Sequence, residues 1–360
     1  MASEFSDTFK TLGAWLSGDG QDADIVVSSR VRLARNIAGN AFTGALPTSE
    51  REALCHQIES VIDSQSIARP DRVYRMNALN ENEKRLLVER HLVSRDFASA
   101  DGARSVAIND DETLAIMILE EDHLRIQALR SGFAPREAYR AASDVDDVIG
   151  EKLPYAFDDD YGYLTACPTN IGTGLRVSAM LHLPALAMTG HIDRVVRSGR
   201  ELQLTVRGMY GEGSDPTGHF FQLSNQATLG QDESQFIDRL ETALPEIIKY
   251  ENNARQTLLM KNRRALEDKI WRAYGQLQNA RLLSSEEAMN LLSLARLGIQ
   301  TGLLPHVAFN AFNEILIRIR PAHLQIFDGR EMDSFERDAA RADIVRSLFR
   351  RTSPDAGRSR

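Results

Sequence analysis

Four short stretches of this sequence gather residue types that can do chemistry, and CPTNIGTGLR at residues 167–176 is the most unusual of them. It places Cys167 beside a proline, two glycines and Arg176, whereas the other cysteine, Cys55, lies in an apolar run with helical spacing. A thiol near a glycine turn, a helix start and an arginine has surroundings that lower its pKa. We therefore expect a packed Cys55 and a chemically active Cys167, the alternative for Cys167 alone being a structural thiol.

Three further stretches place charged residues next to expected strands or glycine turns. They are SSRVR with Arg30 and Arg32, EEDHLR with Glu120, Glu121 and Arg125, and RGMYGEGS with Arg207 and Glu212. Taken singly, each fits a simpler alternative: a solvated strand face, an exposed acidic turn or a surface loop. His123 alone is more typical of a packed or surface histidine than of a metal ligand. The glycines on both sides of Glu212 would let the backbone approach a ligand closely.

Taken together, the four stretches are complementary in charge. Five arginines at the ends of structural elements can surround a polyphosphate, because guanidinium groups form charge-assisted, two-pronged hydrogen bonds with phosphate. Two carboxylates and a thiolate would instead surround a cation. An anion pocket next to a cation pocket predicts transfer of a phosphoryl group from a nucleotide to a guanidinium. Because guanidinium has a pKa above about 12, its nitrogen needs a general base before it attacks.

Length, composition and charge limit the class of protein. A chain of 360 residues, 42% of them hydrophobic, predicts two globular domains. The net charge of -8 argues against a general nucleic-acid binder, which neutralises phosphates with excess lysine and arginine. Two cysteines are too few for a disulfide framework or a cysteine zinc site and indicate a reducing compartment. Without a signal-peptide pattern or a membrane-length apolar run, we expect a cytoplasmic protein that binds no membrane.

The elements that must position these residues change character along the chain. Up to about Gln231, helices alternate with strand-like runs at residues 24–37, 114–129 and 202–211. Residues 173–190 are expected to form one amphipathic helix that Gly190 closes. This mixture predicts an α/β or α+β arrangement for the first part of the chain.

After Gln231 the apolar periodicity is helical only. Pro245 is expected to break or restart a helix, and Ser284 is expected to cap another helix that Gly298 ends. These patterns predict a first domain at residues 1–254, a helical domain at 255–348 and a disordered tail at 349–360.

The four stretches resemble the signatures of the phosphagen (guanidino) kinase family, above all CPTNIGTGLR and EEDHLR. The resemblance covers roughly residues 24–230, with the motifs in the family's order. It implies an α+β fold, in which a catalytic domain with a mainly antiparallel sheet flanked by helices precedes an all-α C-terminal domain. The family's separate N-terminal helical domain, which helps to enclose a small free substrate, is absent from this sequence. With RDAARA at residues 337–342, the sequence resembles the branch of the family that phosphorylates arginine in proteins.

The resemblance implies a role for each of these residues. The family's phosphate-binding arginines match Arg30, Arg32, Arg125, Arg176 and Arg207, and its substrate carboxylates match Glu121 and Glu212. Glu121 would accept a proton, while the Cys167 thiolate would orient and polarise the guanidinium without a covalent intermediate. ATP is the implied phosphoryl donor, and Mg2+ would come with the nucleotide and use no side-chain ligands. His91 is a candidate for contact with adenine.

In the C-terminal helices the resemblance implies a second site, where Arg337, Asp338 and Arg341 bind phosphoarginine and stimulate the kinase. Arg337 and Arg341 are four residues apart and share one helical face, and the alternative is a simple pair between Asp338 and Arg341. Apolar residues that include Trp271 predict a homodimer, unless they complete an internal core. The implied partners are protein substrates with accessible arginines, a McsA-type activator and a Clp-type chaperone-protease.

The sequence leaves three functions open. The leading expectation is an ATP-dependent protein arginine kinase that marks proteins for stress response or degradation. A kinase of free arginine or another small guanidino compound is the alternative of the same class, and a phosphoarginine-binding regulatory module is the alternative of another class. The complete set of arginines, glutamates and cysteine disfavours the last. Eukaryotic-type protein kinase chemistry is disfavoured because no Walker A, HRD or DFG pattern occurs. Leu119, where many family members have a polar residue, predicts a reshaped edge of the substrate pocket.

Overall fold

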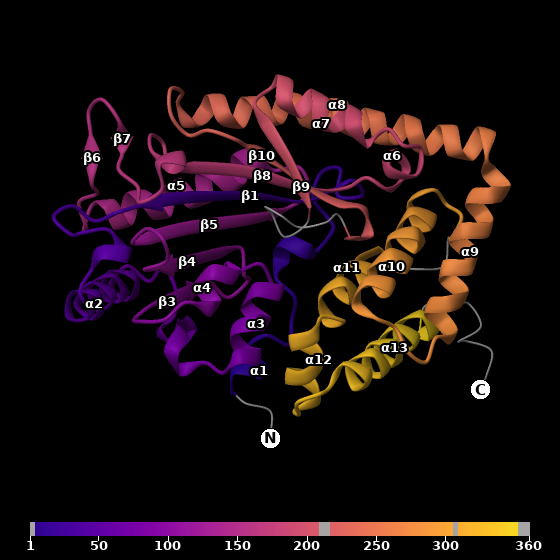
Figure 1. Cartoon of the computed structure of the whole chain (residues 1–360), viewed down its shortest axis with the longest axis horizontal. Helices are drawn as coiled ribbons and strands as arrows, with labels where there is room; N and C mark the ends of the chain where they lie inside the picture. The colour runs from indigo at the N-terminus through magenta and orange to yellow at the C-terminus, as the bar shows by residue number, and fades with distance from the viewer. Residues whose placement is uncertain (1–3, 209–216, 305–308, 352–360) are drawn as a thin grey trace.

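The centre of the molecule is an eight-stranded sheet with the order β2-β3-β4-β5-β1-β8-β10-β9 (Figure 1). This computed structural model describes residues 4–208, 217–304 and 309–351. The strands are β1 Val26–Arg35, β2 Val73–Arg75, β3 Ser105–Ile108, β4 Leu114–Ile118, β5 Leu124–Ser131, β8 Leu175–His182, β9 Leu204–Gly208 and β10 Phe220–Asn225. All neighbouring pairs are antiparallel, so the predicted mainly antiparallel sheet is confirmed. A separate hairpin consists of β6 Phe157–Asp158 and β7 Gly162–Tyr163.

The sheet has an apolar face and a basic face because residues alternate along β1. Val31 and Leu33 are buried in the main hydrophobic core. Helices α5 (Pro135–Gly150) and α8 (Glu233–Lys261) pack against the central strands and contribute to the same core. Arg30 and Arg32 alternate with these residues and therefore point to the opposite face.

Shorter helices surround the sheet, and the C-terminal helices gather on one side of the molecule (Figure 1). Before α8, the helices are α1 Glu4–Thr8, α2 Thr48–Ser64, α3 Glu81–Glu89, α4 Arg95–Ser99, α6 Pro184–Met188 and α7 Ile192–Glu201. After it come α9 Arg263–Asn279, α10 Ser285–Gln300, α11 Phe309–Arg318, α12 Pro321–Asp328 and α13 Ser334–Arg351. Short 3-10 turns that matter below are η1 Ala14–Leu16, η5 Pro168–Asn170 and η6 Thr217–His219.

The helix predicted at residues 173–190 is wrong. Residues Leu175–His182 form β8, which is paired on one side with β1 and on the other with β10. Leu175, Val177, Ala179 and Leu181 do alternate with more polar residues, but the apolar Met180 and the apolar run of α6 that follows hide this period of two. The helical part is confined to α6, where Pro184 supplies a fixed φ at the first turn.

Two of the expected helix boundaries in the C-terminal part also differ from the structure. Pro245 lies inside α8, which continues unbroken, with buried Leu244 and Ile247 holding this stretch on the core. Ser284 caps α10 as predicted, because its hydroxyl accepts a hydrogen bond from the Glu287 N–H at 3.1 Å. Gly298 does not end that helix. A Cβ there would lie 2.5 Å from Ile270, so the glycine permits close packing of α10 on α9.

One hydrophobic core extends through both predicted domains, from Trp15 to Phe349. The predicted boundary between residues 254 and 255 lies within α8, where Arg255 is buried and paired with Asp24 and Glu251. That division of the chain stays a prediction. The tail was expected from residue 349, yet Phe349 is buried in α13, which ends at Arg351; the residues after that lie outside the described structure. Within the described ranges, no helix has the length and apolarity needed to cross a membrane.

Candidate active site

Four of the predicted arginines lie on the basic face of the central strands. In an antiparallel sheet, directly opposed residues share a face, and every second residue along a strand returns to it. Arg32 is opposed to Arg176 across β1 and β8, and Ala34 is opposed to Arg125 across β1 and β5. Because Arg30, Arg32 and Ala34 alternate on β1, the register places all four guanidinium groups on one face.

Arg207 joins the same face from the edge strand β9. It is opposed to Gln222 of β10, which is opposed in turn to Met180 of β8. Met180 is four residues from Arg176 and therefore points the same way. The predicted arginines thus come from four different strands and converge on one surface.

This face, called the arginine face below, carries Arg30, Arg32, Arg125, Arg176 and Arg207. Their positive charges repel one another. Burial, followed by the charges of Arg176 and Arg125, lowers the pKa of Arg30 to about 10. Burial and the neighbouring arginines also hold the pKa of Arg32 well below its usual value. The Nε of Arg32 is buried with no hydrogen-bond partner among the described residues. A polyphosphate would supply both the missing acceptors and the missing negative charge, so this face fits the triphosphate of a nucleotide.

The turn between β4 and β5 places carboxylates at the edge of the arginine face. Glu120 forms an ion pair with Arg125 at 2.5 Å, and it also accepts a hydrogen bond from the Ser94 hydroxyl. Glu121 is more exposed and lies 3.4 Å from the other terminal nitrogen of Arg125. Glu120 therefore fixes Arg125, while the Glu121 carboxylate stays largely available for another cation.

Glu121 and Cys167 meet at this edge although 46 positions separate them. Burial raises the pKa of Glu121, and a hydrogen bond from the Cys167 side chain opposes that rise together with the charge of Arg125. Cys167 itself is partly exposed and lies at the start of η5, with its sulfur 3.0 Å from the Thr169 hydroxyl. A carboxylate with a raised pKa beside a thiol has the composition of a site that binds a cation and accepts a proton.

Asp122, which was not among the predicted site residues, connects the turn that carries Glu121 to the loop that carries Cys167. Its Oδ1 accepts hydrogen bonds from the Asn36 side chain and from the Ala166 N–H, both at 2.7 Å. Asp122 is 1% exposed, and it lies one residue from Glu121 while Ala166 lies one residue from Cys167. The carboxylate therefore fixes the two expected catalytic side chains relative to each other. The only signal in the sequence was its place inside EEDHLR.

His123 is a structural residue, as its sequence context indicated. Its Nδ1 accepts a hydrogen bond from the Ile37 N–H at 2.9 Å, so Nε2 carries the proton and donates to the Ala41 carbonyl at 2.8 Å. Both ring nitrogens are used. Across the residues that the structure describes, no group of three or more histidine, cysteine, aspartate or glutamate side chains could hold a metal ion.

The glycines of CPTNIGTGLR are required by close backbone approach. Gly172 has a φ of +107°, and a Cβ there would lie 2.4 Å from the Thr228 carbonyl oxygen. The Thr228 hydroxyl donates to the Thr169 and Ile171 carbonyls, while Thr173 N–H donates to the Thr228 carbonyl at 3.0 Å. Thr228 therefore holds the loop that carries Cys167, in addition to Asp122.

The other residues predicted at this site are Glu212, His91 and Leu119. Glu212 lies outside the described residues, in the segment 209–216 between β9 and η6. His91 is 8% exposed and packs edge-on against Trp15, and burial with the nearby charge of Arg30 lowers its pKa to about 3. Its contact with adenine stays a prediction. Leu119 is fully buried in the hydrophobic core, so it does not reshape the edge of the pocket through its side chain.

The RDAARA segment lies on α13 and its two arginines differ in burial. Arg341 is 1% exposed and donates to the carbonyls of Ile319 and Leu283 as well as to the Asp338 carboxylate. Arg337 is half-buried and donates to the Met332 carbonyl at 2.6 Å. A phosphate held by both guanidinium groups would therefore require Arg341 to leave interior partners, whereas Arg337 and Asp338 are nearer to solvent.

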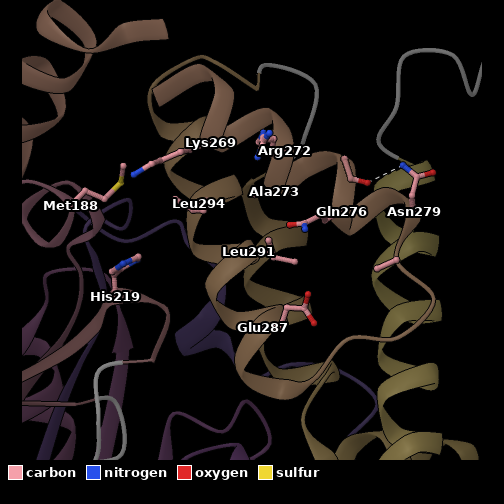
Figure 2. Close-up of a pocket in the computed structure, with 12 residues that line it drawn as sticks. Met188, His219, Lys269, Arg272, Ala273, Gln276, Asn279, Glu287, Leu291 and Leu294 are labelled. Atoms are coloured by element: carbon pink, nitrogen blue, oxygen red, sulfur yellow. Dashed lines mark hydrogen bonds between the residues drawn. The ribbon is translucent and has the colours of Figure 1, made fainter. Parts of the chain in front are cut away.

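A groove of about 1110 Å³ lies apart from the arginine face and the RDAARA segment. Residues of α6 and η6 line one side of it, and residues of α9 and α10 line the other. Figure 2 shows Met188 and His219 on one side of it and Lys269, Arg272 and Leu291 on the other. None of the predicted site residues in the described part of the chain lines it.

Comparisons with known proteins agree with this geometry. Residues 53–254 match the model of the ATP:guanido phosphotransferase C-terminal catalytic domain, and residues 263–359 match the model of the protein-arginine kinase McsB C-terminal domain. The chain is 45% identical to the protein-arginine kinase of Symbiobacterium thermophilum, over 92% of this chain and 95% of that one. It is 43% identical to the protein-arginine kinase of Brevibacillus brevis, over 93% of this chain and 95% of that one.

Solved structures give the same fold. The duplicated taurocyamine kinase from Schistosoma mansoni, with bound transition state analog components, superposes with a TM-score of 0.59 at 25% identity. The match covers 70% of this chain and 36% of that duplicated chain. A lombricine kinase superposes with a TM-score of 0.57 at 24% identity, over 72% of each chain, and this likeness concerns the fold alone.

Proposed function

The chain belongs to the ATP:guanido phosphotransferase family and to its protein-arginine kinases, and we propose that it phosphorylates arginine through the arginine face and the Glu121–Cys167 edge. The observation that carries this proposal is the convergence of the arginines on one face of the sheet, with a carboxylate and a thiol at its border. An anion pocket and a cation pocket side by side are what transfer from ATP to a guanidinium needs.

The arginine face would hold the phosphates of ATP and stabilise the charge that spreads over the transferred group. Arg125 is already oriented by Glu120, so it would bind without further reorganisation. Mg2+ would arrive with the nucleotide, with no side-chain ligands from this chain, and it would neutralise part of the phosphate charge. Arg207 would approach from the edge strand β9 and complete the enclosure of the phosphates.

The Glu121–Cys167 edge would hold the guanidinium of the target arginine and accept a proton from it. Glu121 and Glu212 would orient the guanidinium, and Glu121 would accept one N–H proton as the nitrogen forms its bond to the γ-phosphorus. The bond from that phosphorus to the bridging oxygen breaks, so ADP leaves with the electron pair. In the free enzyme the Cys167 thiol donates to Glu121. In the substrate complex Cys167, as a thiolate, would place another negative charge against the guanidinium. The raised pKa of Glu121 supports the proton-accepting role, because a stronger base takes the proton more readily.

Further properties belong to the same proposal. Arg337 and Asp338 would bind phosphoarginine on α13, with Arg341 holding the helix in place. Two free cysteines fit a reducing compartment and a cytoplasmic location. Trp271 is 49% exposed on α9, which supports a homodimer through the C-terminal helices. A McsA-type activator, a Clp-type chaperone-protease and a role in stress response complete the proposal.

Comparing substrates tests the function. The protein is incubated with ATP and Mg2+ together with an unfolded arginine-rich polypeptide, the same polypeptide with lysine in place of arginine, or free arginine. We expect acid-labile phosphate on the arginine polypeptide only. Equal transfer to free arginine would indicate a small-guanidino kinase, and the absence of transfer in all three reactions would contradict kinase activity.

A further inference from the structure

Two chain segments border the end of the CPTNIGTGLR loop. The Tyr163 N–H of β7 donates to the Gly172 carbonyl at 2.8 Å, and the Gly172 N–H donates back to the Tyr163 carbonyl at 3.3 Å. The next residue of the loop, Thr173, donates through its N–H to the Thr228 carbonyl at 3.0 Å. The β6–β7 hairpin and the segment around Thr228 are therefore neighbours of one loop. Figure 1 shows the hairpin standing away from the sheet (Figure 1).

Both segments carry large apolar side chains that solvent reaches. Phe157, Tyr161 and Leu229, called the apolar border below, are each between 53% and 58% exposed. Leu229 lies beside Gly172, because a Cβ on that glycine would be 2.9 Å from the Leu229 Cα. Tyr161 directly precedes Gly162, where a Cβ would be 2.7 Å from the Gly172 carbonyl oxygen. Single exposed apolar residues are ordinary, but three of them around one loop form a surface that a partner can cover.

The hairpin is held in place although each of its strands has only two residues. A hairpin of that size is not stable alone in water. The guanidinium carbon of Arg35 lies 3.5 Å from the centre of the Tyr163 ring, a cation–π contact. Arg35 is itself buried and paired with Asp146 at 2.7 Å. The exposed aromatic rings are therefore presented on a fixed backbone, which lowers the entropy cost of binding a partner.

The turn of the hairpin adds negative charge to the apolar border. Asp158 uses its carboxylate inside the turn, where Oδ1 accepts hydrogen bonds from the N–H groups of Asp160 and Tyr161 at 2.9 and 3.1 Å. Asp159 and Asp160 are exposed. A segment that lies across the apolar border therefore meets carboxylates that favour a lysine or arginine over an acidic residue.

The distance to the catalytic edge determines which part of a substrate reaches the apolar border. Tyr161 is six residues from Cys167, so their Cα atoms are at most about 22 Å apart. In an extended segment, residues up to about six positions from the target arginine span the same distance. An unfolded protein offers such a segment with its apolar side chains exposed, whereas a folded protein buries most of them.

We propose that Phe157, Tyr161 and Leu229 form a docking surface for the residues that flank the target arginine in an unfolded protein segment. The inference rests on the proposed function, because it places the target guanidinium at the Glu121–Cys167 edge. It adds a substrate class, namely segments with apolar residues and a further basic residue within about six positions of the arginine. The apolar residues pack on the apolar border, and the basic residue faces the exposed aspartates of the turn.

Two polypeptides that differ only in the flanks of a single arginine test the inference. One has leucine, phenylalanine and lysine within six positions of the arginine, and the other has only glycine and serine there. With ATP and Mg2+, the wild-type protein should show a KM about tenfold lower for the first polypeptide at similar kcat, because docking contacts do not change during transfer. Phe157→Ser combined with Tyr161→Ser should raise that KM to the value of the second polypeptide and leave the second unchanged.

Met260→Ser is the matched control. Met260 is also an exposed apolar residue, but it lies near the other end of α8, about 40 Å along that helix from Glu233. We expect both wild-type KM values from it. The double variant keeps Tyr163 on Arg35, so its melting temperature should stay within about 3 °C of wild type.

Two further variants test the rest of the surface. Leu229→Ser should raise the KM of the first polypeptide about threefold without touching the hairpin. Asp159→Asn combined with Asp160→Asn should raise it about threefold at low ionic strength and less at high ionic strength. An unchanged KM at low ionic strength would remove the basic residue from the substrate class.

The outcomes separate this inference from the proposed function. Equal KM values of the wild type for the two polypeptides would overturn the inference, and so would a double variant that keeps the preference. An equal loss of kcat on both polypeptides would show that the two rings only stabilise the loop, and it would also overturn the inference. Full transfer by Glu121→Gln would instead overturn the proposed function, and no transfer by the wild type to either polypeptide would overturn both.

Discussion

Arg32 and Arg176 stand directly opposite each other on the neighbouring strands β1 and β8 and project from the same face. Like charges in directly opposed positions destabilise an antiparallel pair. Burial first, and then the charges of Arg30, Arg125 and Arg176, lower the pKa of Arg32. The sheet therefore holds an unfavourable arrangement in the absence of an anion.

Replacing Arg32 should make the ligand-free protein more stable and weaken its binding of ATP. We expect Arg32→Met to raise the stability of the ligand-free protein by about 1 kcal/mol, because it removes a buried like-charge repulsion. The same variant should lose most of the thermal stabilisation that ATP confers. Differential scanning calorimetry with and without ATP measures both effects, with Arg140→Met on the exposed side of α5 as the control. A less stable Arg32→Met that keeps its ATP response would contradict this reading.

Asp122 should matter for catalysis although it touches no substrate. Asp122→Ala removes two hydrogen bonds to a buried carboxylate, which we expect to cost about 2–3 kcal/mol of unfolding free energy. It should also lower kcat, because Glu121 and Cys167 lose their common anchor, while ATP affinity changes little. Asp122→Asn keeps one acceptor oxygen and should be milder in both respects. Denaturant unfolding and steady-state kinetics of the two variants decide this, and equal kcat in all three proteins would refute it.

The pH dependence of the reaction should report the contact between Glu121 and Cys167. Transfer needs the Glu121 carboxylate, so activity falls as pH drops through the pKa of Glu121, which burial raises. The Cys167 hydrogen bond lowers that pKa, and its removal in Cys167→Ala should therefore move the acid limb of kcat/KM to higher pH. Cys167→Ser keeps a donor and should leave the limb in place. An acid limb that moves to lower pH in Cys167→Ala would count against the contact.

The two arginines of RDAARA should respond differently to substitution. Arg341→Ala should destabilise the protein by about 2–4 kcal/mol, because a buried guanidinium with three partners is removed. Arg337→Ala combined with Asp338→Ala should keep the fold and lose phosphoarginine binding. Calorimetry with free phosphoarginine and thermal unfolding of both variants test this. Normal phosphoarginine binding by the double variant would place the second site elsewhere.

The sequence predicted the arginine face better than the loops at its edge. Alternation along residues 24–37 already placed Arg30 and Arg32 together, but the pairing of Arg32 with Arg176 depends on a register between residues that are 144 positions apart. Strand β8 was mistaken for a helix because the apolar Met180 and the apolar run of α6 directly after the strand hide its alternation. The grouping of Glu121 with Cys167 was expected from charge complementarity, and the resemblance then implied a role for each residue.

Asp122 shows why the edge of the site was harder to predict. Three acidic residues follow one another in EEDHLR. Only the folded turn determines that the side chains of Glu120 and Asp122 are buried while that of Glu121 is more exposed. Leu119 adopts a φ of +61° at the start of that turn, and the types of the neighbouring residues do not predict this conformation.

Titrating ATP into the Glu121→Gln and Arg207→Ala variants tests most directly whether the phosphates of ATP and the target guanidinium bind in two separate pockets. Glu120, and not Glu121, is the close partner of Arg125, so the phosphate side should survive the loss of the Glu121 charge. The account predicts that Glu121→Gln binds ATP within about twofold of wild type while transfer falls at least about a hundredfold. Arg207→Ala should weaken ATP binding about tenfold or more. Equal loss of ATP affinity in the two variants would contradict separate anion and cation pockets.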